Sequence, residues 1–350
     1  MIRIAIITDQ HFGARKGSKH FHEYFKQFYD EIFFPTIEKE GITTIVDMGD
    51  TFDNRRGIDF WALDWAKKHY FDRLRDMGIT VHTIVGNHTA YYKNTNEVNA
   101  LSLLLGEYSN IICYDKATEI KLDKLNTLLI PWINAENEDE THDIIQKSKC
   151  KVAMGHLELN GFNANKFVVM DHGAERDVYD KFDHVFSGHY HTRSHQDNIR
   201  YLGNPYEIYW SDVDDTRGFN LFDTDTCELT QIDNPFKMFH YVHYEDTPHQ
   251  LIDATKYKDK IVKIIIRKKT DSKAFEKFLD KFYRINVHEL KIVENFIFNG
   301  YYDTEEYESE ENEDTISILN RYIDDSELSL DKTIIKELIK EVYMEACEVE

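Results

Sequence analysis

The sequence is poor in several features that mark particular classes of protein. It holds only four cysteines in 350 residues and no CxxC pair, so neither a zinc cluster nor a disulfide framework is predicted. Reduced thiols in a cytosolic compartment are the expected state. No run of about 18 apolar residues occurs, which argues against a membrane span. The chain runs from Met1 into an apolar segment that ends at Asp9, without the pattern of a secretory signal.

Basic residues are also scarce. Lys and Arg number 42 against 64 Asp and Glu, which gives a formal net charge of −22. A protein that coats nucleic acid needs many phosphate contacts, so this balance argues against one. Much of the acid, however, lies in residues 303–314 and near the C-terminus. An enzyme of this charge that acts on DNA would need local basic patches, bound cations or a basic partner.

Apolar residues are plentiful at 41%, which excludes a disordered chain and allows a sizeable core. Buried strands are predicted at six places, namely residues 2–7, 43–48, 80–85, 128–131, 151–154 and 184–187. Segments whose apolar residues follow helical spacing lie between several of these strands. One contains Phe21, Tyr24, Phe25, Phe28 and Ile32, and another lies around Trp61 and Trp65. Strands that alternate with helices indicate a layered α/β fold.

The later part of the chain has a different organisation. From about Arg200 the pattern is strand-like, and near Lys260 a second α/β segment begins, with a strand over 260–269 and a helix over 274–282. We predict a core over 1–230, an accessory domain over 231–300, an acidic linker over 301–314 and a helical tail over 315–350. The apolar faces of the tail are formed by Ile316, Leu319, Ile323, Ile335, Leu338 and Val342. This tail either folds back on the core or docks on a partner.

Five short polar motifs lie where predicted strands end. In chain order they are Asp9-x-His11, Gly49-Asp50-x-x-Asp53, Gly86-Asn87-His88, Gly155-His156 and Gly188-His189-x-His191. In α/β sheets, ligands bind beyond the carboxyl ends of the strands, so the five motifs are expected to converge on one edge of the sheet.

The residue types in these motifs suit divalent metals. Oxygen and nitrogen donors without thiolate favour Mn²⁺, Fe²⁺ or Zn²⁺, and one carboxylate can bridge two ions about 3.5–4 Å apart. Such a pair clamps a phosphate and activates a water for in-line attack. Any one of these motifs alone is typical of an ordinary loop, but the ordered set of five is not.

This order of motifs resembles the calcineurin-like metallophosphoesterase family over about residues 1–225. The resemblance implies two divalent metals, with Mn²⁺ expected. It implies a first metal held by Asp9, His11, Asp50 and His191, and a second held by Asp50, Asn87, His156 and His189. Asp50 would then be the bridge. His88 matches the family histidine that contacts the phosphate and acts as an acid toward the leaving oxygen.

Within this family the sequence resembles the Mre11-type nucleases, above all those of T-even-like bacteriophages. The similar stretches are HTIVGNH, LIPW, GHLELNGF, SGHYHT, RYLGNP and DTRGF. The resemblance implies a two-sheet sandwich flanked by helices, a small α/β capping domain and a tail that binds a Rad50-type coiled-coil ATPase. It further implies a homodimer that cuts duplex ends and single strands of DNA during recombination and repair. The expected location is the cytoplasm of an infected bacterial cell.

Two positions depart from the family pattern. The third motif commonly continues with Asp, but Thr89 stands here and offers no charge to His88. We hypothesise that His88 is therefore less basic and that turnover is lower or has a different pH dependence. Asp53 stands where some relatives carry a second catalytic histidine. It is a candidate catalytic residue or a carboxylate that supports a ligand histidine.

Cationic and aromatic side chains near the motifs are candidates for DNA contact. The cations are Arg15, Lys16 and Lys19 after the first motif, and Arg55 and Arg56 after the second. The aromatic residues are Tyr91, Tyr92, Tyr206, Tyr209 and Trp210, which either stack on bases or pack in the core.

Two other functions compatible with the motifs stay open. A phosphoesterase acting on a small molecule or a protein would use the same metal ligands but would have no use for the tail. A DNA-end tether with weak catalysis would keep the tail and lose turnover.

Overall fold

The computed structural model describes residues 3–166, 168–245, 252–266 and 271–294, together with Lys332 and Lys336. Residues 1–296 form one compact unit. The predicted linker and the apolar tail positions Ile316, Leu319, Ile323, Ile335, Leu338 and Val342 lie outside the described residues. Among the described residues, no helix is both long and apolar enough to cross a membrane.

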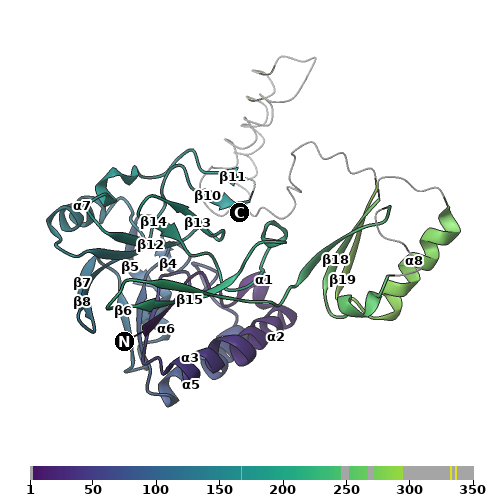
Figure 1. The fold of residues 1–350 in the computed structure, drawn as a ribbon, viewed down its shortest axis with the longest axis horizontal. Helices are drawn as coiled ribbons and strands as arrows, with labels where there is room; N and C mark the ends of the chain where they lie inside the picture. The colour runs from purple at the N-terminus through teal and green to yellow at the C-terminus, as the bar shows by residue number, and fades with distance from the viewer. Residues whose placement is uncertain are drawn as a thin grey trace, which may run out of the picture. The chain divides into compact units, whose positions relative to one another are not determined.

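Two six-stranded mixed sheets form the body of this unit (Figure 1). The first has the order β16-β15-β1-β2-β3-β6, in which β1, β2, β3 and β6 are parallel and β15 and β16 are antiparallel. Its strands are β1 (Arg3–Ile7), β2 (Thr44–Asp47), β3 (Thr80–Ile84), β6 (Ile111–Tyr114), β15 (Gly218–Asp223) and β16 (Leu229–Asp233).

The second sheet has the order β13-β14-β12-β9-β8-β7, with four central parallel strands and an antiparallel strand at each edge. Its strands are β7 (Thr118–Leu122), β8 (Leu125–Ile130), β9 (Val152–His156), β12 (His184–Gly188), β13 (Ser194–Gln196) and β14 (Ile199–Tyr201). Each of the six buried strands expected from the sequence is therefore confirmed.

The interior between the two sheets is apolar. Alternate residues of β1 divide between two cores, because successive side chains of a strand point to opposite faces. Ile4 and Ile6 join Met154 and Phe186 of the second sheet in one cluster. Ala5 belongs instead to the cluster under the helices. Burial on both faces explains why these strands read as continuous apolar runs.

Helices cover the outer face of the first sheet (Figure 1). They are α1 (Ala14–Gly17), α2 (Lys19–Phe28), α3 (Phe34–Glu40), α4 (Phe60–Ala66), α5 (Asp72–Asp76) and α6 (Ala100–Leu104), with π-helical turns η1 (Tyr29–Phe33) and η2 (Lys67–Phe71). The π turn η1 sets Tyr29 so that its hydroxyl donates to Gln10 Oε1 at 2.6 Å, inside the first motif. The aromatic spacing predicted a helix here, but not the π turn.

The remaining short elements lie outside the two six-stranded sheets. They are α7 (Glu138–Lys147), η3 (Arg176–Tyr179), η4 (Trp210–Asp212), η5 (Ala254–Tyr257) and the hairpins β4 (Ala90–Tyr92) with β5 (Thr95–Asn99) and β10 (Asn163–Asn165) with β11 (Val168–Val169). Ile145 of α7 and Tyr179 of η3 pack in the outer cluster of the second sheet.

A third, smaller sheet follows the sandwich. It has the parallel order β17-β18-β19, formed by β17 (Phe239–His243), β18 (Ile261–Ile266) and β19 (Glu289–Glu294). Helix α8 (Ser272–Arg284) buries Phe275, Phe278 and Phe282 against it. Asp271 caps this helix by accepting from the backbone N–H of Lys273 and Ala274. The strand and helix expected after Lys260 are thus confirmed.

Candidate metal centre

The five motifs converge, but they come from two sheets. The first three follow β1, β2 and β3 of the first sheet, whereas His156 ends β9 and Gly188 ends β12 of the second. The prediction of one sheet edge is therefore wrong in this respect. The carboxyl ends of the parallel strands of both sheets meet at the same site, so each sheet supplies part of it.

The backbone of the site is unusual at its polar residues. Asp9, His11, Asp50 and His189 all have positive φ values, of 53°, 48°, 49° and 85°. A residue other than glycine in this region costs about 1–3 kcal/mol and persists only where its surroundings hold it. Four such residues in one place indicate that the loops are shaped for the site rather than for local stability.

Glycine is required where the motif loops approach one another. A Cβ atom at Gly86 would lie 2.1 Å from Asp50 Oδ1, and one at Gly188 would lie 2.0 Å from Thr8 Oγ1. The glycine at each of these two motifs is thus needed for close packing of the neighbouring loop.

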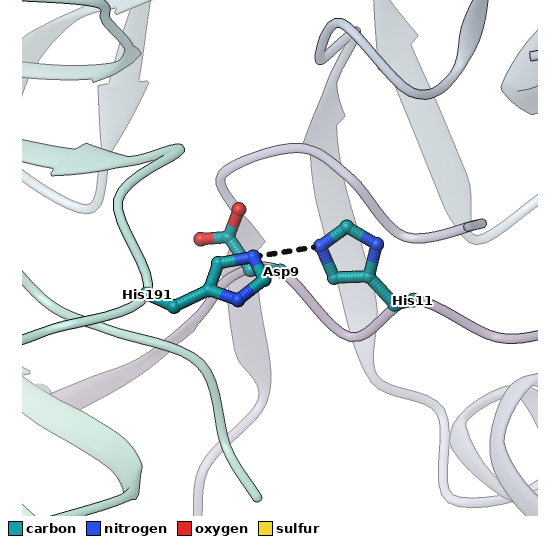
Figure 2. Close-up of side chains that lie close together, drawn as sticks. All are labelled: Asp9, His11 and His191. Carbon is teal, nitrogen blue, oxygen red and sulfur yellow. Dashed lines mark hydrogen bonds between the residues drawn. The ribbon is translucent and has the colours of Figure 1, made fainter. Parts of the chain in front are cut away.

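One group of converging ligand atoms contains Asp9, His11 and His191 (Figure 2). The Nε2 atoms of the two histidines lie 3.0 Å apart and face each other. Their ligand atoms and one carboxylate oxygen of Asp9 all lie within 4.8 Å of one another.

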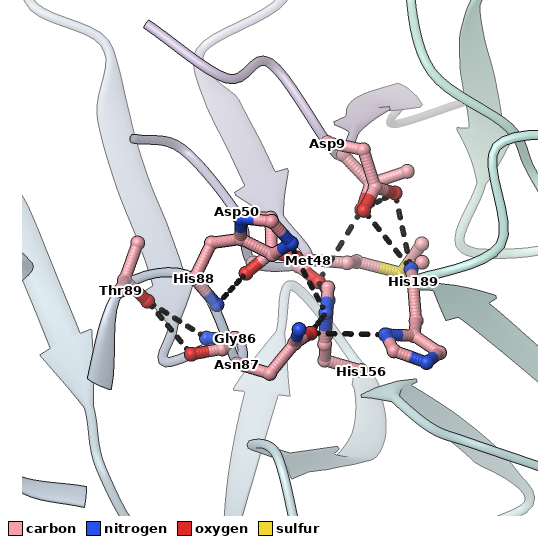
Figure 3. A network of polar contacts seen from close by, with 12 residues as sticks. Asp9, Met48, Asp50, Gly86, Asn87, His88, Thr89, His156 and His189 are labelled. Atoms are coloured by element: carbon pink, nitrogen blue, oxygen red, sulfur yellow. Dashed lines mark hydrogen bonds and ion pairs between the residues drawn. The ribbon is translucent and has the colours of Figure 1, made fainter. Parts of the chain in front are cut away.

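A second group contains Asp50, His156 and His189, joined by Asn87 (Figure 3). The Nε2 atom of His156 lies 3.0 Å from Asp50 Oδ2. The Oδ1 atom of Asn87 lies 2.8 Å from His156 Nε2 and 2.9 Å from His189 Nδ1. The seven ligands expected from the sequence are therefore all brought together.

The outer nitrogens of these rings show which atoms are left for a metal. Nδ1 of His156 lies 2.9 Å from the Met48 carbonyl, so that nitrogen carries the proton and Nε2 faces the site. Nδ1 of His11 lies 3.2 Å from Asp53 Oδ1, which likewise leaves its Nε2 inward. Inward lone pairs of imidazole, carboxylate and amide groups suit a divalent cation, so the residues present fit a metal.

Burial and neighbouring charges shift the pKa values of the histidines in opposite directions. Burial opposes the protonation of His11, but Asp53 and Asp50 raise its pKa to about 9. Burial acts likewise on His156, whose pKa is raised to about 9 by Asp50. For His189, burial and the neighbouring His156 lower the pKa to about 3. A cation bound here would replace the protons that now balance the buried carboxylates.

Asp50, the residue expected to bridge the metals, is ionised. Burial opposes its ionisation, yet His156 and His88 hold its pKa well below the usual carboxyl range. Its Oδ1 accepts from the backbone N–H of His88 at 2.9 Å, while its Oδ2 faces His156. The side chain is thus an ionised carboxylate that contacts both motif loops.

His88 lies beside the first group, and its ring forms a further cluster of potential ligand atoms with His11 and Asp53, all within 4.8 Å of one another. Its Nδ1 lies 2.7 Å from the Asp53 carbonyl, so Nε2 is directed into the site, 4.0 Å from Asp50 Oδ2. Thr89 is directed elsewhere. The Thr89 hydroxyl donates to the Gly86 carbonyl at 3.0 Å and accepts from the Gly86 N–H at 2.9 Å (Figure 3). A backbone carbonyl, rather than the Thr89 side chain, orients the His88 ring.

Sequence reasoning missed one carboxylate. Oε2 of Glu158 lies 4.0 Å from His189 Nε2, the nitrogen that faces away from Asn87. Glu158 follows His156 by two residues, which was the only signal available. Asp53 and Glu158 thus each lie behind one ligand histidine.

The candidate DNA-contacting cations fall into two groups. Arg15 donates to the Ile208 carbonyl at 2.9 Å, and Arg55 lies over the Trp132 ring at 4.8 Å, so both pack on the protein. Lys16 and Arg56 are exposed, and Lys19 is exposed at the start of α2.

The aromatic candidates divide in the same way. Tyr206 and Trp210 are buried in the core, and Tyr209 is half-buried with its ring stacked on His191. Tyr91 and Tyr92 are 43% and 50% exposed on the hairpin that follows His88.

The clustered histidines and carboxylates at the strand ends are consistent with a divalent metal centre of a metallophosphoesterase. The calcineurin-like phosphoesterase family matches residues 2–193, and the chain belongs to this family. Exonuclease subunit 1 of Enterobacteria phage T4 is 37% identical over 256 residues, which cover 73% of this chain and 74% of the phage protein.

A solved structure of an archaeal phosphodiesterase aligns with this chain with a TM-score of 0.35 and 11% sequence identity. That alignment covers 67% of this chain and all of the other.

Proposed function

We propose that this protein is a Mn²⁺-dependent DNA nuclease that hydrolyses phosphodiester bonds at duplex ends and in single strands. The observation that carries the proposal is the complete set of seven ligands and His88 around Asp50, in a chain 37% identical to an exonuclease subunit. Its biological setting is then recombination and double-strand break repair.

The residues divide the chemistry among them. Asp9, His11, Asp50 and His191 would hold a first metal, and Asp50, Asn87, His156 and His189 a second. Two divalent ions bound there would activate a water for attack and would neutralise charge on the phosphate. His88 presents Nε2 to the site, and in its protonated form it donates that proton to the leaving oxygen. Asp53 acts through the His11 ring and through the carbonyl that orients His88.

Exposed cationic and aromatic side chains near the motifs hold the DNA, despite the net charge of −22. Lys16, Lys19 and Arg56 are exposed near the first two motifs, where they neutralise phosphates. Tyr91 and Tyr92 offer exposed rings on the β4–β5 hairpin, suited to stacking on unpaired bases. Arg55 contacts this hairpin by donating to the Tyr92 carbonyl at 3.4 Å.

The partners proposed are a second copy of the chain and a Rad50-type coiled-coil ATPase. The apolar tail over 315–350 is the ATPase-binding segment, and the phage relative is itself described as a subunit. A chain that ends before Tyr301 retains basal nuclease activity and loses ATPase binding in a pull-down. Retained binding would place the ATPase surface elsewhere.

The direct test is cleavage of end-labelled duplex DNA with Mn²⁺. Wild type is expected to trim the ends, while His88→Ala loses about 100–10,000-fold in rate and keeps both metals. His195→Ala is the matched control, because this exposed histidine lies on β13 and its Nε2 contacts the Asp197 carbonyl. Intact DNA together with hydrolysis of a small phosphodiester would favour a small-molecule enzyme. If the protein cleaves neither DNA nor the small phosphodiester but binds DNA tightly, the result would favour a DNA-end tether.

A further inference from the structure

A buried arginine lies directly behind the first group of ligands. Arg217 precedes β15, and its side chain is 1% exposed. Its Nη2 atom donates to Asp212 Oδ1 and to Asp215 Oδ2, each at 3.0 Å. Burying a guanidinium is costly unless its charge is balanced, and two carboxylates balance the charge of this one. Its Nε has no hydrogen-bond partner among the described residues.

The other arm of the guanidinium reaches the metal centre. Nη1 donates to the backbone carbonyl of His191 and to Asn204 Oδ1. The backbone N–H of Asn204 donates to the same His191 carbonyl at 3.3 Å. Asp215 Oδ2 also accepts from the Thr192 hydroxyl at 3.0 Å, so His191 and the residue after it are both held.

The same segment contacts the His191 ring. Tyr209 stacks on it with a centroid distance of 6.1 Å and an interplanar angle of 17°. The backbone N–H of Tyr209 donates to Asp212 Oδ2 at 2.9 Å. Asp212 therefore connects the guanidinium that holds the His191 peptide to the residue that faces its ring.

We propose that Arg217 is a positioning residue that fixes His191 and thereby sets the affinity of the first metal, but not that of the second. The inference rests on the proposed two-metal function. His189 is held differently, because its backbone N–H donates to the Asp9 carboxylate at 3.1 Å. Lysine cannot replace the clamp, since it lacks the planar fork that serves two carboxylates and two oxygens together.

The test uses variants that isolate each half of the centre in the full-length chain. Asn87→Ala weakens the second half and leaves the first, whereas His11→Ala leaves the second. Arg217→Lys is expected to weaken Mn²⁺ binding about 10–100-fold in the Asn87→Ala protein and less than about threefold in the His11→Ala protein. The readout is the signal of free Mn²⁺ in electron paramagnetic resonance titrations, which needs no turnover.

Arg193→Lys is the control, because Arg193 lies two residues beyond His191 but donates to Leu202 O and Asp233. It should change neither titration. Equal weakening in both backgrounds, or none in Asn87→Ala, would overturn the inference. Should Arg217→Lys fail to fold by circular dichroism, Asp215→Asn, which weakens the same clamp at its less buried edge, is judged by the same criterion. A wild type that binds fewer than two Mn²⁺ would instead contradict the proposed function.

Discussion

The two halves of the centre have similar ligands but different supports. In the first half, the Asp53 carboxylate lies 3.2 Å from His11 Nδ1, and the Arg217 guanidinium holds the carbonyl of His191. In the second half, His156 is oriented by the neutral Met48 carbonyl at 2.9 Å. Glu158 stands farther from His189, at 4.0 Å.

This difference shows that similar ligand sets can depend on different parts of a fold. Charged side chains position the ligands of the first half. Substitutions that remove charge without changing shape should therefore weaken metal binding there. The backbone carbonyl of Met48 at the end of β2 orients His156 in the second half, so the geometry of this ligand follows from the sheet itself. In the proposed two-metal site, Asp50 is common to both halves.

The largest effect is expected for Asp50→Asn, which removes the shared carboxylate. Both halves should lose affinity together, and hydrolysis should fall by about 1,000-fold or more, because electrostatic stabilisation by both ions is weakened at once. Metal stoichiometry by calorimetry and the rate on a small phosphodiester measure this. If the Asp50→Asn variant keeps one tightly bound Mn²⁺, the halves are independent of each other.

The second-largest effect is expected in the pH dependence of metal binding, which distinguishes the two halves. His11 and His156 have pKa values raised to about 9, so below that pH each holds a proton that coordination must displace. Apparent Mn²⁺ affinity should therefore rise with pH, by about tenfold per unit for each half between pH 7 and 9, and level off above. In Asp53→Asn the first half should lose most of this slope, because Asp53 raises the His11 pKa. Titrations in buffers of different ionisation enthalpy count the protons, and a slope unchanged by the substitution would contradict this account.

Neutralising each supporting carboxylate should give unequal effects. Above about pH 9, where protons no longer compete for His11, Asp53→Asn is expected to lower first-half affinity about 10–100-fold. Under the same conditions Glu158→Gln should lower second-half affinity less than about tenfold. The reason is the shorter approach of Asp53 to its histidine. Both are measured by Mn²⁺ titration. A larger loss in Glu158→Gln would mean that the carboxylate moves onto His189 when metal binds.

The smallest effect on the centre is expected for Thr89→Asp. The Thr89 side chain is fully buried and faces Gly86, so a carboxylate there does not reach the His88 ring. The pH–rate profile should stay in place, while the free energy of unfolding falls by about 1–3 kcal/mol because a buried charge lacks partners. A shifted profile would restore the hypothesis that Thr89 sets the basicity of His88.

Much of this arrangement could be predicted from the sequence, because apolar runs mark the strands and each motif lies at a strand end. The assignment of strands to two sheets could not. β1 and β9 are both buried on both faces, so their sequences carry no sign of which neighbours they pair with.

The supporting residues were hidden for a related reason. Arg217 lies 26 positions beyond His191, and only the folded loop brings its guanidinium to that carbonyl. The solvent exposure of the aromatic side chains could not be predicted either. Tyr92 and Tyr206 both lie near motifs in the sequence, yet Tyr92 is 50% exposed and Tyr206 is buried. Such differences depend on tertiary packing, which local patterns do not record.

The most direct test of the central claim is a crystal structure with Mn²⁺, with diffraction recorded at the manganese absorption edge. The account predicts two anomalous peaks about 3.5–4 Å apart, bridged by Asp50, with His11 and His191 on one ion and His156 and His189 on the other. A single peak, or two peaks that share no Asp50 oxygen, would contradict it.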